Sequence, residues 1–403
     1  MIDYEEARGL VLSAVKVLPA ETVPLAEAPG RTLARDIKAR EDIPPFTKAT
    51  MDGYAVRAPD TRPAGTGGAV ELEVTEDLPA GRFSRKPVGP GQAVRIMTGA
   101  PLPKGADAVV MVEDTAKRGA RVEVRREVRP GDNIGWAGED LRKGDLVLER
   151  GAVIGPAETG MLAAAGLARV PVVRRPKLAV IATGDEIVEP GERKRPGQIR
   201  NSNGPALLAL AGQAGAEAKY FGIARDRNSS LGVRIRRAKE ADILVLTGGV
   251  SVGDYDLVKD ELRAVGVRPV FWRVRIKPGK PVFFGRRGRQ LVFGLPGNPT
   301  SAMVTFLLFV QPAVQRLLGR EKPGPAGGRA VLTEDIVLKP GRTQFLRAVL
   351  DADGPTLKVA PYSDQRSGVL RSMVRSRVLI VVPADVSRLE KGRAVEILYM
   401  DGR

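Results

Sequence analysis

Between residues 177 and 319, short apolar runs alternate with segments that have helical periodicity. Residues 178–182 and 243–246 are continuous apolar runs, with no polar residue at alternate positions. Strands that are buried on both faces have this pattern, and strands that alternate with helices form a parallel sheet covered on both sides. The pattern therefore predicts a three-layer α/β/α domain around a parallel sheet.

The elements of this domain are predicted from the apolar runs and from the Gly, Pro and capping residues that bound them. Asn203, before Gly204 and Pro205, begins one helix, and Asn298 caps a longer one. The predicted strands are 178–182, 217–223, 243–246, 268–274, 281–284 and 291–293, and the predicted helices are 203–214, 229–240, 256–265 and 299–318.

The rest of the chain predicts two helical segments and several β-rich ones, and Pro156 lies near the first turn of the second helix. Asp3 and Glu6 have the spacing of a capping box, which predicts a helix from residue 4 to about residue 17. Elsewhere, short apolar runs separated by Gly and Pro indicate strands, and those after a Gly/Pro linker are typical of a small β-barrel or sandwich. The predicted domains are an elongated N-terminal/linker domain (1–41 and 141–173), a β-rich module (42–140), the α/β domain (174–320) and a C-terminal β-barrel (326–403).

The chain contains neither histidine nor cysteine. This excludes a disulfide, a thiolate nucleophile, an imidazole base, a Ser-His-Asp triad and the usual zinc or iron–sulfur sites. Chemistry is left to carboxylates, hydroxyls, amines, guanidiniums and backbone N–H groups. Because the remaining metal ligands are oxygens, a bound metal is expected to be Mg²⁺ rather than zinc or copper.

The net charge is strongly positive, with 64 Lys and Arg against 47 Asp and Glu, or +17. Such a charge predicts anionic partners: nucleic acid, a membrane surface, or phosphorylated and oxyanion small molecules. Basic residues are spread along the chain, and aromatic residues make up 4%, which is few for a protein that stacks on single-stranded bases. An arginine-rich genome or a hot habitat is an alternative cause of the excess.

The first residues lack the basic-then-apolar order of a secretion signal. The most apolar stretch, 302–310, has about nine residues, against the ~20 that a membrane helix needs. We therefore expect a cytoplasmic protein without a membrane segment.

Three of the predicted strands end in Gly-rich turns, at 183–186, 247–253 and 294–299. In an open parallel sheet, ligands bind beyond the carboxyl ends of the strands, and glycine lets backbone N–H groups approach a phosphate. Neither the P-loop nor the dinucleotide-binding pattern occurs in the chain. A single turn of this kind is often purely structural, but three at one sheet edge predict a phosphate-bearing ligand.

Lys277 and Lys280 flank a rigid Pro-Gly bend after a predicted strand. Taken alone, such a turn is a solvated basic loop. Beside the three Gly-rich turns, both lysines become candidates for holding a phosphate or another oxyanion.

Three motifs of the chain together resemble the molybdopterin molybdenumtransferases, a family that includes the carboxy-terminal part of gephyrin. They are the turn at 247–253 with Asp256, the basic bend at 276–281 and the turn at 294–299. The resemblance covers essentially the whole chain in the same order. Its further motifs lie in the β-rich module, at 44–46, 51–55, 97–103, 105–110, 131–133 and 138–140.

This resemblance implies a multidomain enzyme of molybdenum cofactor biosynthesis. Such an enzyme takes adenylylated molybdopterin and molybdate, inserts the metal into the dithiolene and releases AMP in a Mg²⁺-dependent step. The dithiolene sulfurs belong to the cofactor, so the missing cysteines are compatible with this chemistry. The resemblance also implies a homodimer in which the α/β domain of one subunit faces the β-rich module of the other, and contact with the molybdopterin adenylyltransferase.

The same resemblance assigns roles to individual residues. Glu186, Asp226 and Asp256 would surround the pyrophosphate and its Mg²⁺, and Lys277 and Lys280 would bind anionic groups. Asp52, Thr98 and Asp140 would approach from the other subunit. The remaining substrate-binding candidates are Thr183, Gly184, Gly248, Gly249, Ser251, Gly253, Pro296, Gly297, Asn298 and Pro299 in the turns, and Arg347 and Ser367 in the C-terminal domain.

Several of these positions also have plain structural interpretations. Asp226 could cap the helix that follows it, Asp52 could be a turn residue before Gly53, and Asp140 could pair with a neighbouring arginine. The chain departs from the family at Arg366, where a small residue is usual, and at Ala49, where Ser is commoner.

Three other functions stay open at this point. The same α/β fold carries adenylyl transfer to molybdopterin, although the additional β modules favour the insertion enzyme. A non-catalytic, anion-binding scaffold is a second alternative, and the charge of +17 motivates a third, nucleic-acid binding. Molybdate and tungstate, tetrahedral dianions of similar size, are equal candidates for the metal source.

Overall fold

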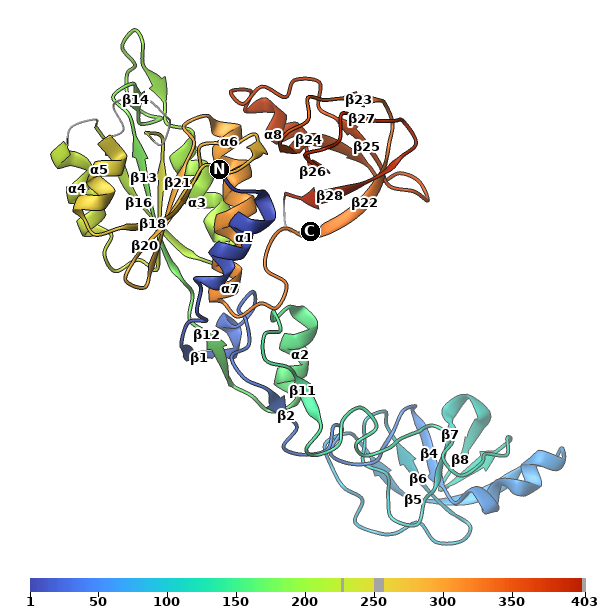
Figure 1. The fold of residues 1–403 in the computed structure, drawn as a ribbon. Coiled ribbons are helices and arrows are strands. Elements are labelled where there is room, and N and C mark those ends of the chain that lie inside the picture. Colours follow the sequence, from blue (N-terminus) through green and yellow to red (C-terminus); the bar gives the residue numbers. More distant parts are fainter. Residues whose placement is uncertain (226–227, 250–256, 401–403) are drawn as a thin grey trace. The chain divides into compact units, whose positions relative to one another are not determined.

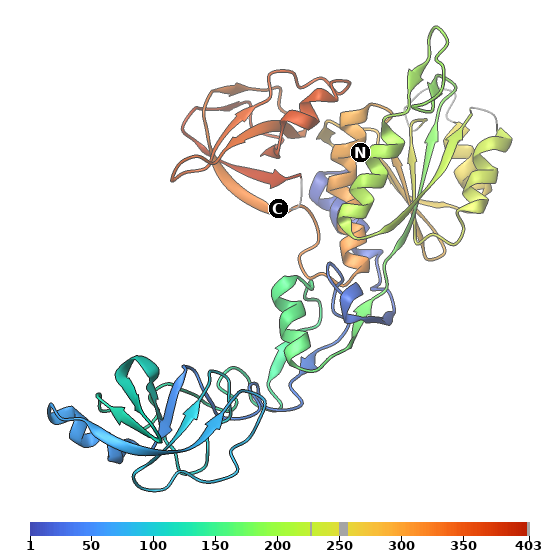
Figure 2. The same ribbon diagram turned by 180° about the vertical axis from the view of Figure 1, so that it is seen from behind.

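The computed structural model describes residues 1–225, 228–249 and 257–400, and these fall into two compact units (Figures 1 and 2). The units are a larger one, made of Met1–Ala34, Gly151–Ile154 and Val170–Arg403, and a smaller one, made of Arg35–Arg150 and Gly155–Arg169.

The larger unit is built around a six-stranded sheet with the order β16-β13-β17-β21-β20-β18. The first four strands are parallel, as predicted, whereas β20 runs antiparallel to both of its neighbours. As a result β18, the edge strand, points the same way as β21, β17 and β13. The strands are β13 (Lys177–Thr183), β16 (Glu217–Ala224), β17 (Ile243–Thr247), β18 (Arg268–Trp272), β20 (Phe283–Arg287) and β21 (Gln290–Leu295).

Helices cover both faces of this sheet, which confirms the three-layer prediction. In β17, Ile243 and Val245 belong to one hydrophobic core, while Leu244 and Leu246 belong to another. Successive side chains point to opposite faces of a strand, so a continuous apolar run supplies both cores. Figure 1 shows α4 and α5 on one side of the sheet and α3, α6 and α7 on the other. The helices are α3 (Asn203–Ala214), α4 (Asn228–Arg237), α5 (Leu257–Ala264), α6 (Pro299–Thr305) and α7 (Gln311–Leu317), with the π-helical turn η4 (Phe306–Val310) between the last two.

The C-terminal part of the larger unit is a closed barrel, as predicted. Its strands follow the order β24-β25-β22-β28-β26, and β24 also pairs with β26. The short strand β19 (Ile276–Lys277) extends this sheet by pairing with β24. The other elements are β22 (Gly327–Leu332), β23 (Ile336–Val337), β24 (Thr343–Asp351), β25 (Lys358–Pro361), α8 (Arg371–Arg375), β26 (Val378–Val382), β27 (Arg388–Leu389) and β28 (Ala394–Tyr399).

The N-terminal helix α1 (Tyr4–Ser13) packs against both the helical layer and the barrel. The ring of Tyr4 meets Phe309 and Phe345 edge-on, with centroids 5.9 and 5.0 Å apart. The capping-box prediction was wrong, because the Asp3 side chain makes no cap hydrogen bond and accepts two from Arg275 instead, both 2.7 Å long. The helix is also shorter than predicted. Further elements of this unit are β1 (Ala20–Pro24), η1 (Leu25–Glu27), β12 (Arg169–Val173), β14 (Ile187–Val188) and β15 (Ile199–Arg200).

The smaller unit is β-rich, as predicted, with a six-stranded sheet in the order β7-β4-β6-β5-β9-β8. The motif after Asp52 forms β4, an interior strand whose four residues are all buried. The elements are β2 (Ile37–Lys38), β3 (Lys48–Ala49), β4 (Gly53–Val56), η2 (Ala58–Thr66), β5 (Val70–Leu78), β6 (Gln92–Ile96), β7 (Ala108–Met111), η3 (Val112–Asp114), β8 (Thr115–Arg118), β9 (Arg121–Val124), β10 (Ile134–Gly135), β11 (Leu146–Leu148) and α2 (Pro156–Ala164).

Within the described residues, no helix has both the length and the apolar character that crossing a bilayer requires.

Candidate functional site

The carboxyl ends of three parallel strands meet at one edge of the larger sheet. Thr247, the last residue of β17, lies beside Ala182 of β13 and beside Leu295 of β21. The Gly-rich turns that follow these strands are therefore neighbours in space. This edge is where ligands bind in open α/β sheets.

A cavity of about 680 Å³ lies at this edge. Its lining includes eight of the residues singled out in the sequence: Thr183, Glu186, Gly248, Gly249, Pro296, Gly297, Asn298 and Pro299. Glu186 is the carboxylate in this lining, and Arg200 is the cation. The cavity also has the dimensions of a small-molecule site, which typically holds ~300–1,000 Å³.

Hydrogen bonds donated by side chains hold the turns together. Asn203 Nδ2 donates to Thr247 Oγ1 and to the carbonyl oxygen of Gly297, both at 2.8 Å. Thr247 Oγ1 in turn donates to the carbonyl oxygen of Pro296, at 3.2 Å. One side chain at the start of α3 thus fixes the second turn against the third.

Sequence reasoning missed the functional interest of Asn203 and of its neighbours Arg200, Asn201 and Ser202, all of which line the cavity. Asn203 was assigned only as the start of a helix. The signal that could have found these residues is the polar run between the exposed strand β15 and the helix α3.

The segment before α3 is fixed by a second set of polar contacts. Asn201 Oδ1 accepts a hydrogen bond from the Gly204 N–H, and Asn201 Nδ2 donates to Tyr220 Oη at 2.7 Å. Tyr220 donates to Glu189 Oε1 at 2.8 Å. Burial, together with this contact to Glu189, raises the pKa of Tyr220, so the hydroxyl stays protonated. The wall of the cavity around Asn201 is therefore held from two sides.

Gly248 is required by its geometry. Its φ of 90° lies in the left-handed region, and a Cβ atom would come 2.5 Å from the carbonyl oxygen of Thr183. Because this oxygen belongs to the backbone, it cannot move aside by a change of rotamer. Only glycine fits where the second turn passes the first.

The backbone N–H groups of the turns are not equally available. Gly184 donates to the carbonyl oxygen of Ala224, and Gly248 donates to that of Leu295, each at 3.2 Å. The N–H groups of Gly249 and Gly297 donate no hydrogen bond to any described residue. Of these four glycines, Gly249 and Gly297 can offer an N–H to an anion.

Ser367 reaches this site from the barrel. Asn298 Nδ2 donates to Ser367 Oγ at 3.0 Å, and Thr300 Oγ1 donates to the carbonyl oxygen of Ser367 at 2.6 Å. The next residue, Gly368, lines the cavity. The loop that carries Ser367 is therefore attached to the first turn of α6.

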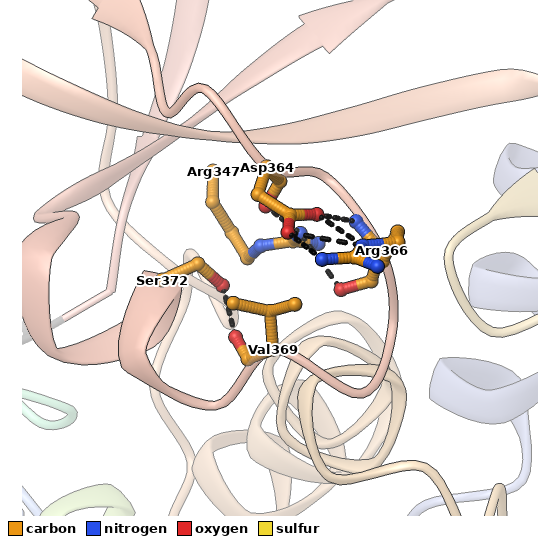
Figure 3. A network of polar contacts seen from close by, with 5 residues as sticks. All are labelled: Arg347, Asp364, Arg366, Val369 and Ser372. Atoms are coloured by element: carbon orange, nitrogen blue, oxygen red, sulfur yellow. Dashed lines mark hydrogen bonds and ion pairs between the residues drawn. The ribbon is translucent and has the colours of Figure 1, made fainter.

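Arg347 lies beneath this loop and is fully buried. Its Nη2 donates to the carbonyl oxygens of Asp364 and Arg366, at 3.0 and 3.2 Å. Figure 3 shows this guanidinium beside the turn from Asp364 to Arg366, with Val369 and Ser372 further along the chain. Its Nε and Nη1 have no partner among the described residues, and burial lowers the pKa of the guanidinium.

Arg366, the departure from the family pattern, forms a forked ion pair with Asp364 (Figure 3). These hydrogen bonds lower the pKa of Asp364 to about 2. The Arg366 side chain is exposed, and it binds Asp364 on the solvent side of the loop. The hydrogen bond between Asn298 and Ser367 is therefore left in place. At the other departure, Ala49 is fully buried in β3.

The two lysines do not line this cavity. Lys277 is the exposed end of β19, and Lys280 follows the Pro-Gly bend and lines a second cavity. Pro281, the next residue, lines the first cavity. The basic bend therefore lies beside the site rather than inside it.

The smaller unit brings two of its three candidates together. Asp52 Oδ1 accepts hydrogen bonds from the Thr98 N–H and the Thr98 hydroxyl, both at 2.7 Å. These contacts lower the pKa of Asp52, so it is a carboxylate at neutral pH. Asp140 is exposed, and its side chain has no hydrogen bond or ion pair among the described residues.

Four candidates lie outside the described residues: Asp226, Ser251, Gly253 and Asp256. Two of them were expected to hold the metal with Glu186. Within the described residues, no group of three or more acidic side chains could bind a metal ion by itself. Mg²⁺ at phosphate sites needs only one or two carboxylates, together with phosphate oxygens and water, and Glu186 fits that requirement.

Three family models match the chain in succession. They are described as the MoeA N-terminal region (domain I and II), over residues 2–166, a probable molybdopterin binding domain, over 179–316, and the MoeA C-terminal region (domain IV), over 329–400.

Full-length relatives agree with these matches. A molybdopterin molybdenumtransferase of Bacillus subtilis is 38% identical over 99% of this chain and 94% of its own length. Molybdopterin molybdenumtransferase 2 of Mycobacterium tuberculosis is 38% identical over 98% of this chain and 99% of its own. A crystal structure of a molybdopterin biosynthesis MoeA protein from Pyrococcus horikoshii has a TM-score of 0.85 at 35% identity and covers 100% of both chains.

Proposed function

The chain belongs to the MoeA family of molybdopterin molybdenumtransferases, enzymes of molybdenum cofactor biosynthesis that insert molybdenum, and we propose that it does so at the cavity beyond β13, β17 and β21. There it would take adenylylated molybdopterin and molybdate and release AMP. The phosphoanhydride between the pterin phosphate and the adenylate would break as an oxygen of water bonds to the adenylate phosphorus, which gives AMP and leaves the pterin its own phosphate.

Two backbone N–H groups and one carboxylate at the same cavity support this proposal most directly. Gly249 and Gly297 offer N–H groups that no described residue uses, and Glu186 lies in the same lining. Phosphoryl chemistry depends on positioning and on neutralisation of negative charge, with little covalent work by side chains. These groups supply that chemistry without histidine or cysteine.

Glu186 is the described residue that we assign to Mg²⁺. The family resemblance adds Asp226 and Asp256, both outside the described residues. When bound, Mg²⁺ neutralises charge on the phosphate oxygens. The N–H groups of the turns would orient the same phosphates, and Asn203 would keep the turns at the correct separation.

Molybdate is a tetrahedral dianion, so it requires cationic and N–H donors. We assign Lys277, Lys280, Arg347 and Ser367 to the anionic groups of the substrates. The unpartnered Nε and Nη1 of Arg347, beneath the loop that carries Ser367, support this assignment. The same loop contacts α6 next to the cavity.

We further propose that the active site is shared between two copies of the chain. Asp52 of the partner subunit would approach the cavity with the partner's Thr98 and the partner's Asp140. The carboxylate of Asp52 is already formed and oriented by Thr98 in a single chain, which supports a role at a charged site. The molybdopterin adenylyltransferase is the partner that would deliver the adenylylated substrate.

One experiment separates this function from adenylyl transfer on the same fold. The purified protein is given either adenylylated molybdopterin with molybdate and Mg²⁺, or free molybdopterin with ATP and Mg²⁺. We expect AMP in the first reaction and no ATP consumption in the second. ATP consumption with adenylylation of free molybdopterin would overturn the proposal.

A further inference from the structure

A second cavity, of about 530 Å³, lies along the edge strand β18 on the side of the sheet covered by α5. Arg263 of α5, Trp272 at the carboxyl end of β18 and Arg273 just beyond it contribute to its lining. Because β18 points the same way as β17 and β21, its carboxyl end lies at the sheet edge that carries the first cavity. The edge with candidate sites thus extends past β20 to β18, two strands beyond β21.

The charge of this second cavity is one-sided. Arg263, Arg273 and Lys280 line it, and its lining contains no carboxylate. None of these three side chains forms an ion pair or hydrogen bond with any residue that the structure describes. Three uncompensated cations around one hollow attract and hold an anion.

The other lining residues are aromatic and apolar. Trp272 is half-buried and packs against Phe283, with ring centroids 4.6 Å apart and planes inclined by 53°. Leu262 and Val267, at the same cavity, are 2% and 3% exposed. An inorganic oxyanion gains no binding energy from an apolar surface, whereas a planar ring packs well against it.

Arg273 is held in an unusual backbone conformation. Its φ is 74°, in the left-handed region that a side chain of this kind rarely adopts. Its N–H donates to the carbonyl oxygen of Val282 at 2.9 Å, so the residue just before β20 fixes the bend. Strained positions of this type gather at ligand sites, where the surrounding structure imposes them.

The two cavities are adjacent along the chain, since Lys280 lines one and Pro281 lines the other. We propose that the second cavity binds a phosphorylated aromatic heterocycle, with the ring beside Trp272 and the phosphate held by Arg263, Arg273 and Lys280. This inference rests on the proposed function, because adenylylated molybdopterin has two halves of this chemistry, the adenylate and the pterin phosphate. One half occupies the second cavity while the diphosphate extends towards the first.

Trp272 provides a direct readout. The chain has two tryptophans, Trp136 and Trp272, so Trp136→Phe leaves Trp272 as the single emitter. This protein is titrated separately with AMP, with molybdopterin under anaerobic conditions, with inorganic phosphate and with molybdate. We expect a saturable change of emission with AMP or with molybdopterin, and the one that binds identifies the half. Inorganic phosphate and molybdate should bind at least about 10-fold more weakly.

Charge variants on the same background test the phosphate end of the site. Arg273→Asn keeps a residue that tolerates positive φ, and Arg263→Gln keeps a helix-compatible side chain. Each should weaken binding about 10-fold, the usual effect of losing a charged hydrogen-bond partner. Arg268→Gln is the matched control, because Arg268 is exposed on β18, is absent from the lining and carries the same charge. We expect the affinity of this variant to stay within about 2-fold of the parent protein.

Three results would overturn the inference. They are an unchanged emission with both AMP and molybdopterin, equal affinity for inorganic phosphate, and an equal loss of affinity in Arg268→Gln. AMP release from adenylylated molybdopterin is measured on the same Trp136→Phe preparation. If turnover persists without binding to Trp272, this cavity assignment fails and the proposed function stands; if the parent protein also shows no turnover, the proposed function fails.

Discussion

Asp52 Oδ1 accepts two hydrogen bonds from one residue, from the N–H and from the hydroxyl of Thr98, each 2.7 Å long. Both contacts favour the ionised carboxylate and lower its pKa. A lowered pKa contributes stability above the ordinary value of 3.8, and that contribution is lost as the pH falls through the value in the folded protein.

Thr98→Val should raise the pKa of Asp52 towards its ordinary value, because it removes the hydroxyl donor and leaves the N–H. The titration is followed by the carboxyl ¹³C resonance of Asp52. Thr115→Val is the control, since the Thr115 hydroxyl donates to a backbone carbonyl instead of a carboxylate. An Asp52 titration that is the same in Thr98→Val and in the parent protein would contradict the assignment.

Asn203→Ala should loosen the cavity by releasing Thr247 and Gly297 from each other. The lost hydrogen bonds predict a fall of about 1–3 kcal/mol in the free energy of unfolding, and we expect a raised KM for the adenylylated substrate. Ser202→Ala is the matched control, because Ser202 lines the same cavity and its side chain makes no hydrogen bond to a described residue. Unfolding by denaturant and steady-state turnover are measured on both variants, and equal unfolding free energies would rule out the bridging role.

Gly248→Ala should be severely destabilising, by about 2–4 kcal/mol, because a Cβ must meet the carbonyl oxygen of Thr183 in a left-handed backbone. Gly297→Ala is the comparison for stability, since its Cβ would have its nearest contact at 3.6 Å and its φ is not left-handed. Thermal and denaturant unfolding distinguish the two. If both variants unfold like the parent protein, the close approach of the first two turns is wrong.

Mixed dimers test whether the site is shared between subunits. Asp52→Asn and Glu186→Gln should each be inactive as homodimers. In a mixture, half of the dimers are mixed and each of these has one intact site, so activity should return to about one quarter of the parent value. If both residues serve a site within one chain, every site in the mixture carries one substitution and activity stays absent.

The sequence predicted the layers of the fold well, because a strand that is buried on both faces has a continuous apolar run. The runs that became β13 and β17 supply both hydrophobic cores, and no other arrangement uses their alternate residues equally. The direction of β20 was not predictable in the same way. A parallel and an antiparallel strand that are buried on both faces have the same apolar run. The tight turn between β20 and β21 makes these two strands antiparallel.

Contacts between distant residues account for the errors. Asp3 has the spacing of a helix cap, but Arg275 lies within reach in the folded chain and forms a charged, two-pronged contact that local capping does not match. A distant contact also involves Gly184, a substrate-binding candidate, because its N–H donates to the carbonyl oxygen of Ala224 on β16. Neither partner can be inferred from spacing along the chain.

The candidate site was predicted in part. Turn residues such as Gly248 and Gly297 could be found because strand ends of a parallel sheet meet at one edge. Asn203 could not be ranked by sequence alone, since an Asn before Gly-Pro is an ordinary helix start, and its bridging role depends on the separation of two turns more than forty residues away along the chain.

The most direct measurement counts AMP released and molybdenum bound to the pterin in one reaction with adenylylated molybdopterin, with and without molybdate, for the parent protein and for Glu186→Gln. We predict that the parent protein gives equal amounts of AMP and pterin-bound molybdenum, and no AMP without molybdate. In Glu186→Gln we predict an unchanged fold and a turnover at least about 100-fold lower. AMP release that is independent of molybdate, or normal turnover in Glu186→Gln, would contradict insertion of molybdenum at this cavity.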